Sequence, residues 1–334
     1  MSWWEGKPVL VTGAQGFIGS WLVERLLTEE AKVLVLQRPQ DRPSRFRSRG
    51  LAERCRAVRA DLLDLLELRR VLHDERVRAV FHLAASSSVP TAAGAPLATF
   101  EINARGTWNV LEACRSVPET PERVVVASSV RAYGMQERLP YVEDMELRPV
   151  KTYDVSKACA DHIARSYAAL YELPVAVTRF ANVFGGGDFN LSRLVPGTTA
   201  ALLSGQAPVI RSDGTAERDF LYVEDAVSAY MAVAESLGDP DNHGRAWNAG
   251  LGHPVTVLEI VRALIARSGV HTEPDIRGEG AVDGEMPRYW LDSSAIQREL
   301  GWGAGWDLQR GLEATYDWYA ENRVATDGAL PTTR

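Results

Sequence analysis

Tyr153 and Lys157 are the residues with the clearest chemical potential, and they lie four positions apart. On one helix this spacing places both side chains on the same face, so the ammonium group lies beside the phenol. A neighbouring cation favours the phenolate and can bring the tyrosine pKa from about 10 toward working pH, where the phenol exchanges a proton with a substrate hydroxyl. Ser129 follows an apolar run and supplies a hydroxyl to hold that oxygen. The same spacing arises by chance on amphipathic helices, so its interpretation depends on the surrounding elements.

A glycine-rich turn near the start of the chain predicts a dinucleotide site. The apolar run Pro8–Thr12 precedes the turn, and a helical pattern follows it. In the order strand, turn, helix, glycines let the backbone approach a pyrophosphate while the helix N-terminus donates hydrogen bonds to it. The residues expected to bind the cofactor here are Gly13, Gln15, Gly16, Phe17, Ile18 and Gly19.

The end of the second predicted strand, residues 31–36, bears on the choice of cofactor. An NAD-selective site usually has Asp or Glu there, whereas this chain has Gln37-Arg38. Because an arginine can accept a 2′-phosphate, Arg38 favours NADP. Arg38 could equally be solvated or stack on adenine, since several arginines follow in the same loop, so NAD versus NADP stays open.

Two further strands are expected to end against the cofactor. Asp61, at the end of the strand that starts at residue 56, could meet the adenine amino group or cap the helix starting near Leu62. Both Asp61 and Leu62 are expected to contact the cofactor. The buried run 79–85 ends in Leu83, Ala84 and Ala85, whose small size lets a cofactor lie against the backbone.

Two polar positions in and after the run 79–85 have competing interpretations. We interpret His82 as a core histidine with its hydrogen bonds satisfied. Ser86 lies at the strand edge where ligands bind in open α/β sheets, although a plain loop fits as well.

Strands and helices alternate through the first half of the chain, which predicts a Rossmann-type, doubly wound parallel sheet of the α/β class. We assign residues 1–180, with about 220–250, to a dinucleotide-binding domain. Residues 181–219 and 251–325 form a smaller substrate domain, and 326–334 a tail. Further expected elements are helices at 99–114, 223–235, 257–268 and 308–319, and strands at 123–128, 175–182 and 244–249.

Composition excludes several function classes. A formal net charge of -7 argues against nucleic acid or an acidic membrane surface as a partner, because phosphate binding needs a positive field. The three cysteines, Cys55, Cys114 and Cys159, have no metal-ligand spacing and are expected to be free thiols. No apolar run approaches a membrane span, so we expect a cytoplasmic protein without a metal.

Arginines recur in the loop-rich region after residue 190. Arg193, Arg211 and Arg218 offer the guanidinium forks that a diphosphate or nucleobase requires. Isolated surface arginines are common, so only Arg218, within Arg-Asp-Phe-Leu-Tyr-Val, is favoured as functional on this ground.

Several motifs occur in one order along the chain. They are Gly13-x-x-Gly16-x-x-Gly19, His82-Leu-Ala-Ala85, Asn103 with Gly106-Thr107, Ser129, Tyr153-x-x-x-Lys157, Arg179-Phe-Ala-Asn182, Arg218-Asp219-Phe220 and Leu300-Gly-Trp302. In this combination the chain resembles the extended short-chain dehydrogenase/reductases that modify nucleotide sugars, from about Pro8 to Tyr319. Tyr153-Asp-Val-Ser-Lys157 and Asn182-Val-Phe-Gly-Gly-Gly-Asp188 are most similar to proteins classed with CDP-glucose 4,6-dehydratases.

The resemblance implies a reaction through a 4-keto sugar on a tightly bound, recycled NAD(P). Tyr153 would remove the sugar O4 proton while the C4 hydride moves to the nicotinamide, with Lys157 on the cofactor ribose and Ser129 on O4. Asn103 is an implied cofactor contact, as are Tyr153 and Lys157. The implied substrate contacts are Ser86, Ser129, Val130, Arg131, Asn182, Arg193, Leu194, Arg211, Arg218 and Arg288.

One position departs from the dehydratase pattern. Those enzymes follow the active-site hydroxyl with Asp-Lys or Asp-Glu, which expels water from C6, whereas this chain has Val130-Arg131. Valine cannot transfer a proton, so elimination lacks its usual acid unless Ser86, Glu137 or another group substitutes.

The favoured function is therefore 4-epimerisation of a nucleotide-diphosphate sugar. The alternatives are a 4,6-dehydratase with a relocated acid, a 4-keto-sugar reductase, and a non-catalytic cofactor sensor. Retention of Ser129, Tyr153 and Lys157 argues against the sensor. The resemblance also implies a homodimer that pairs the helix at 99–114 and the Tyr153 helix of each subunit.

Overall fold

The computed structural model describes residues 2–36, 43–87, 89–280 and 286–322. Its largest element is a seven-stranded sheet whose neighbouring strands all run parallel. The chain moves outward from β1 through β2 to β3 and then returns to β4 on the other side of β1, which places a topological switch point between β1 and β4. In spatial order the strands are β11 (Ala246–Ala249), β6 (Val175–Phe180), β5 (Arg123–Ala127), β4 (Ala79–His82), β1 (Pro8–Thr12), β2 (Lys32–Leu36) and β3 (Arg56–Val58).

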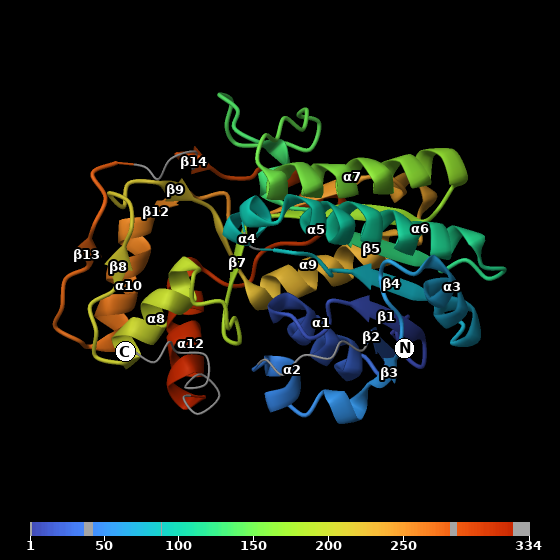
Figure 1. Cartoon of the computed structure of the whole chain (residues 1–334), viewed down its shortest axis with the longest axis horizontal. Helices are drawn as coiled ribbons and strands as arrows, with labels where there is room; N and C mark the ends of the chain where they lie inside the picture. The colour runs from blue at the N-terminus through green and yellow to red at the C-terminus, as the bar shows by residue number, and fades with distance from the viewer. Residues whose placement is uncertain (1, 37–42, 88, 281–285, 323–334) are drawn as a thin grey trace.

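Helices cover both faces of this sheet, which confirms the predicted doubly wound class (Figure 1). Alternate strand residues point to opposite faces, so Val9 and Val11 join one core cluster and Leu10 the other. The first face packs against α1 (Phe17–Thr28), α2 (Arg45–Ser48) and α9 (Val223–Ser236), and the second against α3 (Leu65–Asp74), α6 (Gly106–Ser116) and α7 (Thr152–Tyr171).

The helix expected over residues 99–114 is interrupted. A π-helical segment, Glu101–Arg105, joins α5 (Pro96–Phe100) to α6, and α4 (Val89–Gly94) precedes them. Short 3₁₀ turns lie at Ala52–Arg54 (η1), Val130–Tyr133 (η3) and Pro240–Asn242 (η4).

A second lobe lies beside the carboxyl ends of the strands, at the left of Figure 1. Its core joins two aromatic strand residues, Phe184 and Phe220, to three helices. The lobe and its connections contain helices α8 (Leu194–Leu203), α10 (Val257–Ser268), α11 (Ser294–Leu300) and α12 (Leu308–Glu321), and the strand pairs β7 (Asn182–Phe184) with β10 (Phe220–Tyr222) and β8 (Val209–Ile210) with β13 (Asp275–Ile276). A third small sheet has the order β12 (Val255–Thr256), β9 (Glu217–Arg218), β14 (Arg288–Tyr289).

The predicted strand 175–182 is a correction here. β6 ends at Phe180, and Asn182–Phe184 starts a separate strand in the lobe, where Asn182 pairs with Phe220. The chain therefore crosses from one sheet to another at Ala181. Because both pieces are apolar and β-branched, sequence alone reads them as one strand.

A buried ion pair fixes α7 to the sheet. Arg179 of β6 donates from Nε and Nη2 to the carboxylate of Asp161, at 2.8 and 2.9 Å, and both side chains are fully buried. Arg179 Nη1 donates to the Tyr133 hydroxyl, which donates to Asn248 Oδ1 at 2.8 Å. The network ties α7, β6, η3 and β11 together, with its charges paired and hydrogen-bonded.

Two smaller expectations are also settled. All three cysteines are free, but only Cys114 is fully buried, and Cys55 and Cys159 are half-buried. Across the described ranges, the longest apolar helical stretch still falls short of what crossing a bilayer requires.

Candidate active site

The N-terminal turn of α7 presents Tyr153 beside the end of β5. Lys157, one turn later, is buried and donates from Nζ to the carbonyl oxygen of Ala127 at 2.5 Å. Ser129 begins η3, and its Oγ accepts from the Arg131 amide at 3.2 Å. Its hydroxyl also hydrogen-bonds to the Tyr153 side chain. The structure thus brings together Ser129, Tyr153 and Lys157.

The electrostatics around the tyrosine differ from the simple expectation of a lowered pKa. Burial raises the pKa of Tyr153, and Asp154 adds to this, whereas Arg193, the Ser129 hydrogen bond and Arg131 act in the opposite direction. Burial also lowers the pKa of Lys157 to about 8, against the opposing effect of Asp161. The cations that favour the phenolate therefore include two arginines that the sequence did not connect with it.

Arg131 and Asp154 form an ion pair on the sheet side of Tyr153. Arg131 donates from Nε and Nη2 to the two carboxylate oxygens, at 2.9 and 3.0 Å. Asp154 is 3% exposed, and Val130 beside it is 1% exposed. Val130 and Arg131 directly follow Ser129, at the positions where the related dehydratases have their acid.

Arg193 and Asp188 form a second pair on the lobe side. Arg193 precedes α8 and donates from Nη1 to Asp188 Oδ2 at 2.8 Å and from Nη2 to Ser87 Oγ at 3.1 Å. Leu194, the first residue of α8, is half-buried beside it. Both arginines that lower the Tyr153 pKa are therefore tethered by a carboxylate, Arg131 by Asp154 and Arg193 by Asp188.

The glycine turn has the tight geometry of a cofactor cradle. Gly13 has a positive φ of 75°, and a Cβ on it would lie 2.7 Å from the Ala84 amide nitrogen. A Cβ on Gly19 would overlap the Gly13 carbonyl, so the helix packs against the turn only with glycine there. Gly16 is the N-cap of α1, next to Phe17 and Ile18. These close approaches fit a bound pyrophosphate, with the α1 amides as its donors.

Leu83, Ala84 and Asp61, which are predicted cofactor contacts, lie in different settings. Leu83 and Ala84 lie against the turn, where the Ala84 amide donates to Thr12 Oγ1 at 3.2 Å, and Ala85 follows. Asp61 does not cap a helix, because α3 begins at Leu65 and its cap is Asp64. Instead, Asp61 is exposed and accepts from the Leu63 amide.

Three other predicted positions are packed or lie outside the description. Leu62 is buried, and its carbonyl accepts from Asn109 at 2.9 Å. Arg38 lies outside the described residues. His82 is a satisfied core histidine, as predicted, with Thr12 and Thr107 on its two ring nitrogens at 2.8 and 3.1 Å.

Asn103 is a structural clamp within the π-helical segment. Its Oδ1 accepts from the Ser86 amide at 2.7 Å, and its Nδ2 donates to the Ser86 carbonyl and to Ser156 Oγ. Because both ends of the amide are engaged by protein, Asn103 orients the Ser86 segment relative to α7. A direct cofactor contact by Asn103 stays a prediction.

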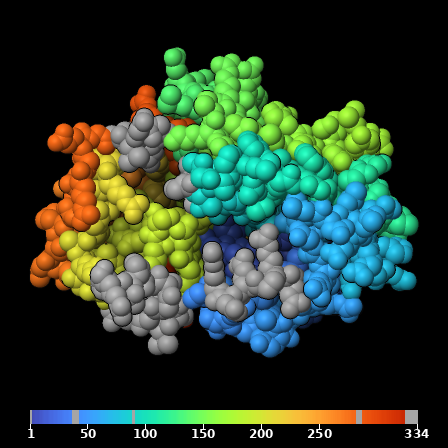
Figure 2. Space-filling model, in the orientation of Figure 1, coloured from blue at the N-terminus to red at the C-terminus, as the bar shows by residue number. Residues whose placement is uncertain are grey.

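A cavity of about 150 Å³ opens beside the glycine turn. Gln15, Gly16 and Phe17 line one side, and Gly187, Asp188 and Phe189 of the lobe line the other, with Pro43 and Ser44 at its rim. Figure 2 shows dark blue N-terminal atoms at the floor of a hollow between the yellow-green lobe and the cyan helices. The cavity joins the cradle to the segment that holds Arg193.

The remaining predicted substrate contacts are dispersed. Arg218 is buried, donates to the carbonyls of Glu217 and Pro287, and lies over the Tyr289 ring at 4.8 Å. Asn182 exchanges hydrogen bonds with the Tyr289 hydroxyl at 3.0 Å. Arg211 and Arg288 are exposed, in the β8–β13 and β9–β14 parts of the lobe.

The comparison with known proteins decides the family. The family described as NAD dependent epimerase/dehydratase matches residues 9–250. The chain belongs to this family. A UDP-glucose 4-epimerase from Mycolicibacterium smegmatis is 30% identical over 313 residues, covering 93% of this chain and 97% of the relative. A dTDP-glucose 4,6-dehydratase from Neisseria gonorrhoeae is 31% identical over 349 residues, covering 97% and 99%.

A solved structure of a family member agrees over the whole fold. The dTDP-glucose 4,6-dehydratase DesIV from Streptomyces venezuelae, with NAD bound, has a TM-score of 0.86 at 29% identity and covers 97% of this chain and 100% of its own. The epimerase/dehydratase chain is thus an NAD-dependent enzyme by family, and the activities of its relatives divide between epimerisation and dehydration.

Sequence reasoning missed two carboxylates at this epimerase/dehydratase site and a third, Asp219, in the connection between sheet and lobe. Asp154 was visible only as the neighbour of Tyr153, and Asp188 only as the end of a glycine run. Asp219 is buried and accepts from the amides of Leu251, Gly252 and Leu291, and burial raises its pKa to about 6. The available signal for Asp219 was its place directly before the apolar run Phe220-Leu221-Tyr222-Val223.

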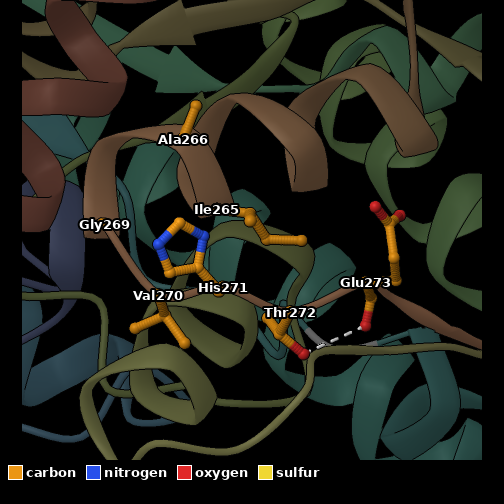
Figure 3. Close-up of a pocket in the computed structure, with 7 residues that line it drawn as sticks. All are labelled: Ile265, Ala266, Gly269, Val270, His271, Thr272 and Glu273. Carbon is orange, nitrogen blue, oxygen red and sulfur yellow. Dashed lines mark hydrogen bonds between the residues drawn. The ribbon is translucent and has the colours of Figure 1, made fainter.

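Another surface hollow lies away from this site. Figure 3 shows that residues 265–273, at the end of α10 and in the segment after it, line the hollow. Thr272 donates a hydrogen bond to the Glu273 carbonyl at 3.3 Å (Figure 3). The lining is one continuous stretch of lobe surface.

Proposed function

We propose that this enzyme epimerises a nucleotide-diphosphate sugar at C4. The observation that carries the proposal is the pair of residues that follow Ser129. Val130 is buried, and Arg131 donates to both carboxylate oxygens of Asp154. A valine and an arginine leave the hydroxyl of Ser129 and the phenol of Tyr153 to act on one oxygen, because an arginine in a protein stays protonated and only donates.

The chain's own residues account for the proton transfer. Tyr153 takes the proton of the sugar O4, and Ser129 donates a hydrogen bond to that oxygen as its charge develops. Lys157 is buried near these two side chains and supplies positive charge. Because its pKa of about 8 is close to the working pH, a bound ligand changes its protonation. A bound NAD(P) would supply the acceptor for the C4 hydride, and return of that hydride to the opposite face of the 4-keto sugar would give the 4-epimer. Reprotonation of O4 by Tyr153 then completes the exchange.

The lobe supplies the substrate contacts in this proposal. Arg193 and the amide of Leu194 at the start of α8 would meet the diphosphate, because a cation and a helix N-terminus both favour negative charge. Ser86, Asn182 and Arg218 would line the path between sheet and lobe, and Arg211 and Arg288 would close it from outside. Residues 181–219 and 251–325 thus form the proposed substrate domain, beside a cofactor domain of residues 1–180 and about 220–250.

Incubation with UDP-, CDP-, GDP- and dTDP-hexoses tests the reaction. The expected product has the same mass as its substrate and differs at C4 by NMR. A product lighter by one water would contradict epimerisation. Cofactor that stays bound through purification would favour internal recycling, whereas a requirement for added NADPH would indicate a reductase.

A 4,6-dehydratase is the second candidate, and Asp154 is the observation that favours it. Asp154 lies next to Tyr153, and burial raises the pKa of its carboxyl, against the opposing effect of Arg131. Asp154 is therefore a described acid beside Tyr153, and it would donate a proton only after the Arg131 guanidinium leaves its carboxylate. If a dehydrated product forms, Asp154→Asn should abolish it while exchange at C4 continues.

Val130→Asp sharpens the choice between these chemistries. The acid would stand beside Ser129, so gain of a 4-keto-6-deoxy product would show that position 130 separates the two reactions. Val130→Asn is the matched control, since it has nearly the same shape and polarity without an acid. Equal products from both variants would refute the role of position 130.

The choice of cofactor is proposed on Arg38. The family is NAD dependent by description, and an arginine at the end of the second strand would add affinity for the 2′-phosphate of NADP. The ratio of the two dissociation constants in the native chain and in Arg38→Ala tests this. An unchanged ratio would remove the NADP preference.

We also propose a homodimer through α5, α6 and α7. These helices expose large apolar side chains, with Leu97 74%, Trp108 44% and Leu170 70% exposed. Pairing two copies would remove that surface from water. Light scattering should give twice the 36.7 kDa chain mass, and Leu97→Lys with Leu170→Lys should give the monomer. A monomeric native protein would contradict this proposal.

A further inference from the structure

The segment Gly185–Asp188 is wedged between the two halves of the molecule. A Cβ on Gly185 would lie 2.5 Å from Val223 Cγ1 of α9, and a Cβ on Gly186 would overlap the Trp318 ring of α12. These contacts come from opposite halves. The segment therefore has little room to move relative to either.

The end of the segment is fixed as firmly. A Cβ on Gly187 would lie 2.8 Å from Arg45 Cδ, and Arg45 is 3% exposed. The Trp21 indole donates to the Gly186 carbonyl at 2.9 Å, and the Tyr319 hydroxyl donates to the Asp188 carbonyl at 2.5 Å. Hydrogen bonds to the Gly186 and Asp188 carbonyls thus fix the backbone at Asp188, independently of the bonds that its carboxylate makes.

The Asp188 carboxylate turns this fixed backbone into an anchor. It is 4% exposed; Oδ1 accepts from the Asn190 amide at 3.1 Å and Oδ2 from Arg193 Nη1 at 2.8 Å. Arg193 itself is 36% exposed along its side chain, and its other fork reaches Ser87. A half-exposed arginine has many rotamers, so its placement depends on these two partners.

Arg193 is the cation with the largest effect on the tyrosine, and it lowers the pKa of Tyr153. The other charged or titratable groups that face Tyr153 are Arg131 of η3, Asp154 of α7 and Tyr230 of α9, with Lys157 one helical turn along. Because Arg131 and Asp154 largely offset each other, the charge of Arg193 is the one whose displacement the phenol would register.

We propose that Asp188 is a positioning residue, which holds the Arg193 guanidinium between Ser87 and Tyr153 and so presents it to the diphosphate of the substrate. This inference rests on the proposed function at the same site. Asp188 exchanges no proton and acts only through Arg193. The rigid glycine segment explains why a single carboxylate suffices for the task.

Asp188→Asn is the central test, because asparagine keeps an oxygen for the Asn190 amide and removes only the charge. We expect UDP, CDP, GDP or dTDP, whichever the native chain binds best by calorimetry, to bind about tenfold more weakly, as for loss of one charge-assisted bond. Arg193→Gln should have a similar effect. The double variant should bind no more weakly than Arg193→Gln alone, since Asp188 acts through the arginine.

Ultraviolet titration of the phenol in the cofactor-free protein is the second readout, with Tyr153→Phe as the blank. Its midpoint should rise in Asp188→Asn and in Arg193→Gln. Ser192→Ala is the matched control, because it removes a neighbouring hydrogen bond in the same loop without a change of charge. It should shift neither midpoint nor affinity.

The outcomes separate the inference from the function beneath it. A native chain that binds none of the nucleoside diphosphates would overturn the proposed function. Native binding with an unaltered Asp188→Asn would overturn the inference alone. If Asp188→Asn does not fold, Arg193→Lys replaces it, because lysine keeps the charge and loses the fork. Native affinity and a native phenol midpoint in Arg193→Lys would then refute the inference.

Discussion

The sheet and the lobe position the residues around Tyr153 in different ways. On the sheet side, the helix that carries Tyr153 and Lys157 is fixed by the fully buried pair of Asp161 and Arg179. On the lobe side, Arg193 lowers the Tyr153 pKa from its place at the end of a loop, and its side chain is 36% exposed. The proposed proton-transfer group thus lies on a rigid element, and the proposed diphosphate contact lies on a long side chain that needs an anchor.

This difference suggests a division of labour. Proton transfer requires atoms placed within a fraction of an ångström, which regular elements and buried hydrogen bonds provide. Recognition of different nucleotide sugars needs a surface that changes without disturbing the sheet, which loops provide. One fold can therefore host both relatives named above, a 4-epimerase and a 4,6-dehydratase.

Tyr153→Phe should have the largest effect on activity. Loss of the phenol removes the general acid and base, so turnover should fall by about 10²- to 10⁴-fold. The melting temperature should stay close to native, because the ring remains. Tyr167→Phe, on the same helix with its hydroxyl on Glu112, is the control. Comparable losses in both variants would contradict the assignment of Tyr153.

Asp161→Asn should have the largest effect on stability. It leaves the Arg179 charge without its partner in a fully buried position, and such a loss costs about 3–5 kcal/mol. Urea unfolding followed by circular dichroism gives the free energy. A decrease of less than about 1 kcal/mol in the free energy of unfolding would show that the buried ion pair does not fix the helix rigidly to the sheet.

His82 should make the stability of the sheet side depend on pH. Burial lowers its pKa to about 3 in the folded chain, against about 6.5 when unfolded. Between these pH values the unfolded chain binds more protons than the folded chain. The contribution of His82 to the free energy of unfolding is therefore complete above about pH 6.5 and decreases as the pH falls, by about 2 kcal/mol at pH 5.

Unfolding of His82→Gln measured against pH tests this, because the variant should lose that part of the acid dependence. His271→Gln, exposed in the lobe, should keep it. If the two variants give parallel curves, another group causes the acid sensitivity.

Arg267→Gln should have the smallest effect. Arg267 pairs with Asp317 across α10 and α12 of the lobe, with 38% and 46% of the side chains exposed. Exposed pairs contribute less than about 1 kcal/mol. A loss as large as that of Asp161→Asn would abolish the distinction between the two sides.

Sequence predicted the fold where pattern is local. Pro8–Thr12 and Val257–Ser268 begin and end where expected, because an apolar run before a glycine turn and a capped amphipathic helix are self-contained signals. It failed where two sheets meet at Ala181 and where Asp64 rather than Asp61 caps α3, since these depend on three-dimensional context.

The candidate site divides in the same way. The spacing of Tyr153 and Lys157 is readable along one helix. By contrast, the role proposed for Asp188 depends on Tyr319, 131 residues away, and on an ion pair with Arg193 that no sequence periodicity predicts. The Arg131 and Asp154 pair spans 23 residues across a loop. Such long-range partners need the fold before they can be named.

The π-helical segment between α5 and α6 has a consequence for winding. Thr99, Asn103 and Thr107 are all buried at intervals of four, although that interval turns a regular α-helix about 40° past one full turn. The wider π turn removes part of this drift, so the three polar side chains form one row, with Thr107 on His82 and Asn103 on Ser86.

Deleting one residue from 101–105 would restore regular winding and rotate everything after it by about 100°. The polar row would then break, and the exposed Trp108 would leave the face on which we place the dimer. One extra residue in a single turn therefore determines which side chains of this helix face the core and which face the proposed dimer partner.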